Sequence, residues 1–190
     1  MRGTRTREAL LKGAREVFER DGFVDAKITS ITTAAGVAAG SFYTHFDSKD
    51  AIFQALIAEI HEETLHPGIE DAHTPEESIA ATNRAYLEHY DRNARLFVLM
   101  DQVALVDESF REVRQGLSKS VAKRNARAIK RWQDDGLVDK ALDPVITARA
   151  LNAMTSRMAY TRFTGGLRVS NEVLAENLTR LWINALQLRS

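Results

Sequence analysis

Apolar residues recur every three to four positions along almost the whole chain, which is the spacing of amphipathic helices. A first helix is predicted from about Thr6 to Arg20, with Gly22 as the glycine that ends it. No stretch alternates apolar and polar residues as a strand does, and no repeat or low-complexity linker is visible. The pattern therefore predicts an all-α fold of about nine helices.

The segment from Ile28 to Phe46 predicts two short helices joined by a sharp turn. Gly36 follows the first apolar face, and a glycine can take φ > 0 without a Cβ clash. The second helix is expected from about Ala39, with Phe42 and Phe46 on one face. Such a pair is either an ordinary helix corner or a helix-turn-helix, whose second helix enters the DNA major groove.

Two features of this segment favour DNA binding over an ordinary corner. Small residues at 38–41, Ala-Ala-Gly-Ser, open the second helix and let its N-terminus approach another surface closely. Tyr43, His45 and Lys49 are grouped nearby as donors to phosphates.

Residues 31–46, ITTAAGVAAGSFYTHF, followed by DSKDAIF at 47–53, resemble the signature of the TetR family of transcriptional regulators. The resemblance covers roughly the N-terminal third of the chain, and it implies a ligand-responsive repressor with a three-helix DNA-binding head and a larger helical body. Two positions depart from the family pattern. Ala38 stands where Ser commonly caps the recognition helix, a loss worth ~1 kcal/mol. Ala39 stands where a longer polar or basic side chain often reaches a base.

The chain is expected to consist of a DNA-binding domain at residues 1–47 and a ligand-binding and dimerisation domain at residues 48–190. A helix capped by Ser48 and running to about Leu65, before Pro67-Gly68, links the two. Thr74 to Glu77 form a capping box with Pro at the first helical position. Further helices are predicted at about 75–92, 95–106 (capped by Asn93), 107–135 and 144–164, with a last one after Ser170.

Composition and charge exclude several classes of protein. The chain has no Cys, which excludes disulfides, cysteine zinc sites and a thiol nucleophile. No apolar run approaches the ~18 residues of a membrane span, so a cytoplasmic location without membrane contact is expected. The net charge is zero, but the first fifteen residues hold five basic residues and one acidic residue. This basic arm either lies along the phosphate backbone or is a solvated tail.

No catalytic or metal constellation is apparent. The pair His61-Glu62 begins an HExxH pattern, but Leu65 stands where the second histidine is needed. The next histidine, His66, lies on a different helical face. We therefore expect no enzyme activity, no metal and no cofactor. The alternatives to a ligand-responsive repressor are a constitutive DNA-binding regulator and, from another class, a helical enzyme or binding protein that retains the head.

The predicted DNA contacts come from the second and third helices and the start of the fourth. Ser41 and Ala39 would reach base edges, Tyr43, Lys49 and Thr29 would hold phosphates, and His45 could do either. The full predicted set is Thr29, Ala39, Gly40, Ser41, Tyr43, Thr44, His45 and Lys49.

A small apolar or amphipathic effector is expected inside the larger domain, because large and adaptable side chains gather on its helices. The same side chains could simply fill a core. The predicted ligand residues are Tyr86, Tyr90, Phe97, Met100, Asp101, Met154, Arg157 and Met158. Arg157 is expected to pair with a residue such as Asp101, to reach solvent, or to meet an anionic ligand.

A homodimer through the last two helices is expected. A head this small reads few base pairs, whereas two heads can meet a palindromic operator in double-stranded DNA. Leu178, Leu181, Trp182 and Ala185 form the apolar surface predicted for this twofold interface.

Overall fold

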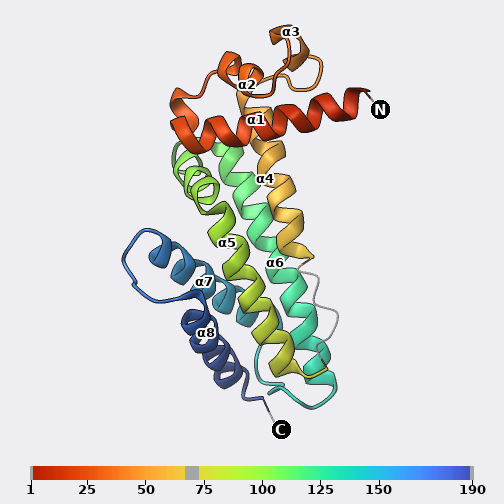
Figure 1. Ribbon diagram of the computed structural model, residues 1–190. Coiled ribbons are helices and arrows are strands. Elements are labelled where there is room, and N and C mark those ends of the chain that lie inside the picture. Colours follow the sequence, from red (N-terminus) through yellow and green to blue (C-terminus); the bar gives the residue numbers. More distant parts are fainter. Residues whose placement is uncertain (1, 67–72, 189–190) are drawn as a thin grey trace. The chain divides into compact units, whose positions relative to one another are not determined.

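The computed structural model describes residues 2–66 and 73–188, and within these ranges the chain forms eight helices and no strand (Figure 1). The helices are α1 (Arg2–Asp25), α2 (Ile28–Ala34), α3 (Ala39–Phe42), α4 (Lys49–Leu65), α5 (Pro75–Val106), α6 (Glu108–Asp134), α7 (Pro144–Phe163) and α8 (Asn171–Leu186). The all-α prediction is confirmed.

The helices form two compact units. Unit 1 consists of residues 1–62 and 95–114, and unit 2 of residues 63–94 and 115–190. Helices α4, α5 and α6 each contribute residues to both units. The functional boundary between residues 47 and 48 stays a prediction, because a compact unit is not by itself a functional domain.

Helix α5 continues through the boundary predicted at Asn93. The Asn93 side chain is buried, and its Nδ2 donates to the carbonyl of His89, four residues earlier in the same helix, at 2.9 Å. A polar side chain that bonds back to its own helix is not available to cap a new one. The predicted separate fifth and sixth helices are therefore one, and this accounts for eight described helices instead of about nine.

The predicted helix starts are confirmed by their cap hydrogen bonds. Ser48 Oγ accepts from the Ala51 amide at 3.1 Å. In the capping box, the Glu77 amide donates to Thr74 Oγ1 at 3.1 Å and the Thr74 amide donates back to the Glu77 carboxylate at 3.2 Å. Pro67-Gly68, predicted to end α4, lies outside the described residues. These caps follow from local sequence alone, which is why they could be predicted.

The α7 and α8 starts are also capped by side chains. Asp143 Oδ1 accepts from the amides of Val145 and Ile146 at 2.9 and 2.8 Å. Ser170 Oγ accepts from the Val173 amide at 3.2 Å. Both caps supply acceptors to amides that would otherwise lack them at the start of a helix.

Unit 1 is held together by a close helix crossing. Gly13 of α1 is buried, and a Cβ built on it would lie 2.8 Å from the Ile31 carbonyl oxygen and 2.8 Å from the Ala35 amide nitrogen. The backbones of α1 and α2 can approach this closely only because residue 13 has no side chain. The crossing places α2 and α3 on one side of α1 (Figure 1).

An aromatic cluster fills the interior of unit 1. The Phe53 ring lies 4.9 Å from Phe18, 5.0 Å from Phe23 and 5.7 Å from Phe110, centroid to centroid. Gly22, at φ 79°, kinks α1 one turn before its end and directly precedes Phe23. Gly22 has non-helical φ and ψ, so the glycine predicted to end the first helix does interrupt it, and a short helical segment follows to Asp25.

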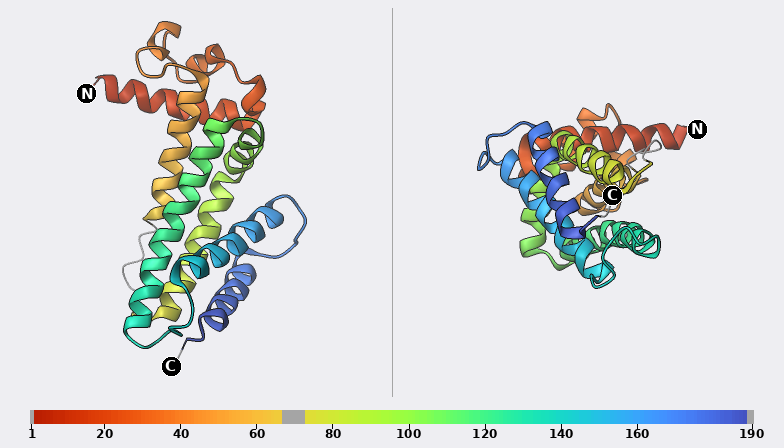
Figure 2. Two further views of the ribbon diagram at one scale, coloured as in Figure 1. Left: turned by 180° about the vertical axis from the view of Figure 1, so that it is seen from behind. Right: turned by 90° about the horizontal axis from the view of Figure 1, so that it is seen from below.

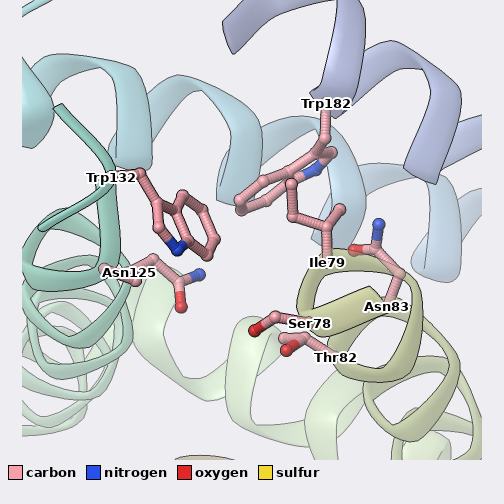
Figure 3. A pocket seen from close by; sticks show the side chains of 8 residues that line it. Ser78, Ile79, Thr82, Asn83, Asn125, Trp132 and Trp182 are labelled. Carbon is pink, nitrogen blue, oxygen red and sulfur yellow. The ribbon is translucent and has the colours of Figure 1, made fainter. Parts of the chain in front are cut away.

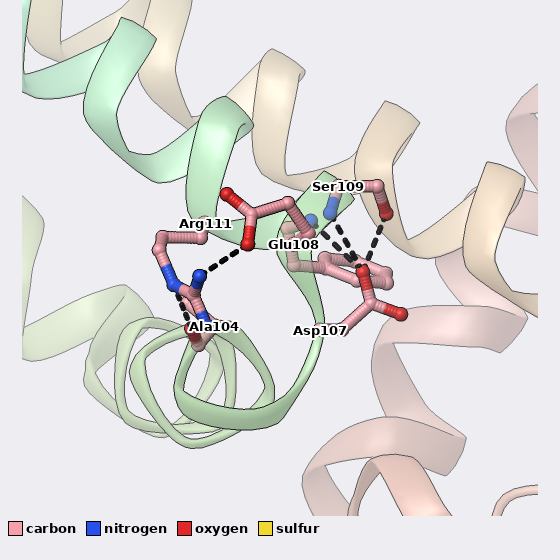
Figure 4. A network of polar contacts seen from close by, with 6 residues as sticks. Ala104, Asp107, Glu108, Ser109 and Arg111 are labelled. Atoms are coloured by element: carbon pink, nitrogen blue, oxygen red, sulfur yellow. Dashed lines mark hydrogen bonds and ion pairs between the residues drawn. The ribbon is translucent and has the colours of Figure 1, made fainter.

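The α5–α6 corner fixes Phe110 in this cluster (Figure 4). Asp107 Oδ1 accepts from the Ser109 amide at 2.8 Å, the Ser109 hydroxyl at 2.7 Å and the Phe110 amide at 3.2 Å. The hydroxyl hydrogen bond from Ser109 holds the pKa of the Asp107 carboxyl below its ordinary value. Arg111 donates to the Ala104 carbonyl at 3.3 Å and pairs with Glu108, which closes the corner from the other side.

In unit 2, helices α7 and α8 lie side by side (Figure 2). Trp182 of α8 is buried, and its indole N–H donates to Thr155 of α7 at 3.1 Å. Leu178 is 1% exposed and belongs to the interior of the same unit. Half of the predicted dimer patch is therefore core, because its spacing placed two residues on the inner face. Leu181, at 51% exposure, and Ala185 remain on the outer face.

The crossing at Gly13 can be tested by adding one methyl group. We expect Gly13→Ala to lower the free energy of unfolding by about 1–3 kcal/mol, because the new Cβ meets backbone atoms that cannot move independently. Urea denaturation monitored by circular dichroism measures the effect.

Gly116→Ala is the matched control, since nothing lies within 4 Å of a Cβ at this helical position. It should raise the free energy of unfolding by about 0.5–1 kcal/mol through the unfolded chain and the helix propensity. Equal effects of the two substitutions would contradict a close approach at Gly13.

Candidate functional site

The α2–α3 segment has the geometry of a helix-turn-helix. Ala35 ends α2, Gly36 adopts φ 65°, and the Gly36 and Val37 amides donate to Thr33 and Thr32 carbonyls at 3.1 and 3.0 Å. In both hydrogen bonds, an amide that follows the helix donates to a carbonyl of its last turn. A glycine at positive φ commonly ends a helix in this way. The turn predicted at Gly36 is confirmed.

Helix α3 buries one face and exposes the other. Phe42 is fully buried and Phe46 is 6% exposed, as predicted for the core of the head, whereas Tyr43 is 63% exposed. Ala38 precedes the helix without any side-chain cap hydrogen bond, which confirms the lost cap. Ala38, Ala39 and Gly40 are exposed, so the start of α3 presents a surface of small groups.

Seven of the eight predicted DNA contacts lie on the outside of the head. Thr29, Ala39, Gly40, Tyr43 and Thr44 are exposed, and Ser41 and His45 are half-buried. The structure thus leaves the predicted readout residues accessible on α2, α3 and the turn that follows.

Lys49 is the exception. Its ammonium donates to the carbonyls of Phe23, Val24 and Ala26 at 2.7, 3.0 and 3.1 Å, and it lies 4.8 Å from the centre of the Phe23 ring. An ammonium has three donors, and all three are used here. The charge also sits at the carbonyl end of α1, where a cation is favourable. Lys49 therefore holds the head together, and the phosphate role predicted from its position is not carried forward.

The basic arm is partly paired within unit 1. Arg7 donates to Glu59 at 3.3 Å and lies 5.3 Å from the centre of the Phe46 ring. Arg15 pairs with Glu19 at 3.2 Å. Arg5 and Lys12 are exposed on α1, and neither forms a hydrogen bond or an ion pair with any described residue. Among the described side chains of the arm, these two cations are available as phosphate donors.

The predicted ligand residues do not line a common cavity in the described ranges. Phe97, Met100 and Asp101 belong to unit 1, and the other five belong to unit 2. Asp101 forms a partly exposed ion pair with Arg114, so it does not pair with Arg157. Arg157 is exposed, with its guanidinium 5.1 Å from the Tyr160 ring centre. Of the three outcomes foreseen for Arg157, the structure shows the one in which it reaches solvent.

A small, partly open pocket lies in unit 2 (Figure 3). Its volume is about 40 Å³. It is lined by Ser78, Ile79, Thr82, Asn83, Asn125, Ala128, Trp132 and Trp182. This volume holds one or a few water molecules and is far below the ~300–1,000 Å³ of small-molecule sites. None of the predicted ligand residues lines it.

A larger pocket of about 240 Å³ lies elsewhere in unit 2. Its wall comes from the end of α4, the first half of α5 and one residue of α6: Glu63, Thr64, His66, Thr82, Ala85, Tyr86, Glu88, His89, Arg92 and Arg124. Tyr86 is the one predicted ligand residue that lines it. The remaining wall is mostly polar, which sequence reasoning missed because the three segments are distant in the chain.

The charged side chain of Arg124 is held in this pocket by hydrogen bonds to backbone carbonyls. It is half-buried, and its Nη1 donates to the Thr64 and Leu65 carbonyls at 2.7 and 3.3 Å. Burial lowers the pKa of its guanidinium below the ordinary value. Across the pocket wall, buried His89 has its Nδ1 3.4 Å from Glu63 Oε2.

No group of three His, Asp or Glu side chains among the described residues is arranged to hold a metal ion. None of the described helices combines the length and apolarity that crossing a bilayer requires.

The N-terminal head is similar in sequence to known regulatory proteins. Residues 10–56 match the family model of bacterial regulatory proteins of the tetR family. The chain is 45% identical over 60 residues to YdgC of Bacillus subtilis (strain 168), named as an uncharacterised helix-turn-helix transcriptional regulator. This alignment covers 32% of the chain and 31% of YdgC, so the similarity spans about a third of the relative's length.

Solved structures extend the likeness to the whole fold. A protein from Rhodococcus sp., described as a TetR-family transcriptional regulator, superposes with a TM-score of 0.84 at 18% identity, covering 96% of this chain and 99% of that one. SmeT, the repressor of the Stenotrophomonas maltophilia multidrug efflux pump SmeDEF, gives 0.76 at 21% identity, covering 94% and 89%. SmeT has also been solved as a complex with triclosan.

At these identities the structures establish the fold, while the sequence match establishes the head. Residues 10–56 thus carry the N-terminal head of the tetR family of bacterial regulatory proteins, and the chain has the fold of solved TetR-family regulators.

Proposed function

We propose that the protein is a ligand-responsive transcriptional repressor that binds a palindromic duplex as a homodimer. The observation that carries the proposal is segment 38–46, which contains α3: it buries Phe42 and Phe46, leaves Tyr43 and residues 38–40 exposed, and half-buries Ser41. A cytoplasmic location and the absence of enzyme activity belong to the same proposal. The repressor role of SmeT supports it.

In this proposal, Ala39 and Ser41 contact base edges and Tyr43 and Thr29 contact phosphates. Gly40 adds no side chain, so the α3 backbone can approach the groove closely; a Cβ there would meet nothing in the head itself. Methyls and one hydroxyl in place of Arg or Lys make apolar contacts with thymine methyls prominent in the readout. Thr44 and His45 stand at the edge of this surface.

The dimer is proposed to form through the outer faces of α7 and α8. Leu181 and Val173 on α8 are 51% and 47% exposed, and Ile146 on α7 is 69% exposed. Apolar side chains exposed in this way on two adjacent helices suit a self-complementary twofold interface. The corrected patch thus replaces Leu178 and Trp182 with residues that are exposed.

Ligand response is proposed from the triclosan complex of SmeT together with the pocket on unit 2. Release of the operator requires only that the effector prefer the conformation that does not fit DNA. A tenfold loss of DNA affinity corresponds to ~1.4 kcal/mol of differential binding. If no ligand changes DNA affinity, the constitutive regulator replaces this part of the proposal.

Selection from a random duplex library tests the division of roles on α3. The wild-type protein should enrich a palindromic sequence. Tyr43→Phe should weaken binding to all enriched sequences by a similar factor, because the hydroxyl contacts a phosphate. Ser41→Ala should instead change the base preference at one position of each half-site. The same uniform loss for both variants would refute the assignment.

The salt dependence of operator binding distinguishes a cation that contacts DNA phosphates, as proposed for Arg5, from Lys49, which contacts backbone carbonyls. Arg5→Gln should reduce the slope of log K against log salt by about 2 per dimer, since each subunit loses one phosphate contact. Lys49→Met should leave the slope unchanged and lower the free energy of unfolding by about 1–3 kcal/mol, because its carbonyl contacts are internal. A reduced slope for Lys49→Met with unchanged stability would restore the phosphate role of Lys49.

Analytical ultracentrifugation tests the dimer interface. Leu181→Glu should shift the protein from dimer to monomer at micromolar concentration, because two carboxylates would be placed near the twofold axis. Leu105→Glu is the matched control, since Leu105 is 78% exposed on α5, outside the proposed interface. A Leu181→Glu protein that stays dimeric would show that the interface lies elsewhere.

A further inference from the structure

In the polar pocket of unit 2, the guanidinium of Arg124 has no carboxylate partner among the described residues. Arg124 donates to Thr64 and Leu65 carbonyls and, through Nε, to Asn125 Oδ1 at 3.1 Å. All three acceptors are neutral, and no carboxylate in the described ranges lies within ion-pair distance of the guanidinium. A half-buried cation with only neutral partners retains a strong preference for an anion.

The guanidinium also retains unused donors. Arginine has five N–H groups, and the hydrogen bonds to Asn125, Thr64 and Leu65 use those of Nε and Nη1. The two N–H groups of Nη2 have no acceptor among residues 2–66 and 73–188. Because the α4 carbonyls fix the planar group in place, little side-chain entropy is lost when an anion binds to the remaining edge.

The other charges of the pocket limit the ligand to one negative charge. Arg92 is a second cation in the wall, and Glu63 and Glu88 are two carboxylates. Glu63 faces His89 at 3.4 Å. A polyanion such as a nucleotide triphosphate would be repelled by the two carboxylates, whereas a single anionic group can meet Arg124 without excess charge.

Size and the remaining wall define the rest of the ligand. The volume of about 240 Å³ is slightly below the ~300–1,000 Å³ of drug-sized sites, so the ligand is small. Ala85, Thr82 and the ring of Tyr86 supply a short apolar surface. The smaller cavity beside Trp132 and Trp182, at about 40 Å³, has no room for an organic molecule.

We infer that this pocket is the effector site and that its ligand is a small monocarboxylate, with the carboxylate on Arg124 and a short apolar remainder against Ala85 and Tyr86. The inference rests on the proposed ligand-responsive function and names the chemical class of its effector. The residue that binds the anionic group of the ligand is then Arg124 and not Arg157, which is exposed.

Calorimetry with matched acid–amide pairs tests the inference on the full chain. Benzoate, phenylacetate and hexanoate are the charged probes, and benzamide, phenylacetamide and hexanamide are their neutral counterparts. At least one acid should bind at least tenfold more tightly than its amide and weaken binding to the selected duplex. Binding of no acid, or equal binding of each acid and its amide, would overturn the inference.

Variants locate the binding. Arg124→Gln should reduce affinity for the acid at least tenfold. Arg127→Gln, which removes an exposed cation one turn further along α6, should leave affinity unchanged. Because Arg124→Gln also removes contacts to the end of α4, Ala85→Leu provides an independent test: it fills the pocket and should block the acid while every Arg124 hydrogen bond is kept.

The result separates the two proposals. If the acids fail to bind while the protein still binds its selected duplex, the effector class is wrong and the DNA-binding function stands. If Arg124→Gln or Ala85→Leu retains wild-type affinity for the acid, the ligand binds elsewhere and the site assignment is wrong. If the duplex itself is not bound, the proposed function fails independently of the pocket.

Discussion

The close approach of α1 and α2 at Gly13 is the constraint on which the DNA-binding head depends. With a Cβ only 2.8 Å from two backbone atoms of α2, no other residue fits without moving the helix. The position of α2 in turn fixes the turn at Gly36 and the start of α3. Lys49 secures the arrangement from the other end by binding three carbonyls that follow the α1 kink. The recognition surface proposed for α3, made of alanines and one serine, requires a rigid support, since small side chains cannot adjust to a misplaced groove.

Sequence could predict the features of this head that are local. Gly36 required a positive φ, Phe42 and Phe46 shared a helical face, and Ser48 stood before an apolar run, so each signal lay within a few residues of its effect. Lys49 was misread because its partners are more than twenty residues away, and a lysine beside a recognition helix ordinarily reads as a phosphate donor. The close approach at Gly13 could not be predicted from the sequence. A glycine within a helix is only a weak helix former, and its contact with α2 becomes visible only in the folded structure.

The larger body was predicted less well for the same physical reason. Composition indicated an apolar effector site, yet adaptable side chains also fill cores, and Met100 and Tyr90 are buried in the fold. The pocket instead combines the end of α4 with α5 and with Arg124 of α6, and no sequence pattern links these segments. The Asn93 boundary failed because an asparagine can bond back to its own helix as readily as it can cap the next one.

In the proposed function, two heads of this type bind one duplex. Hydroxyl-radical footprinting on the DNA that flanks the protein's own gene can test this, because it reports both the site and its symmetry. Two protected regions related by a twofold axis are expected, with their centres about 34–36 Å apart or a multiple of that spacing, and both protections should be lost together when an effector binds. A single unsymmetrical protected region, or uniform protection that disappears at physiological salt, would contradict this proposal.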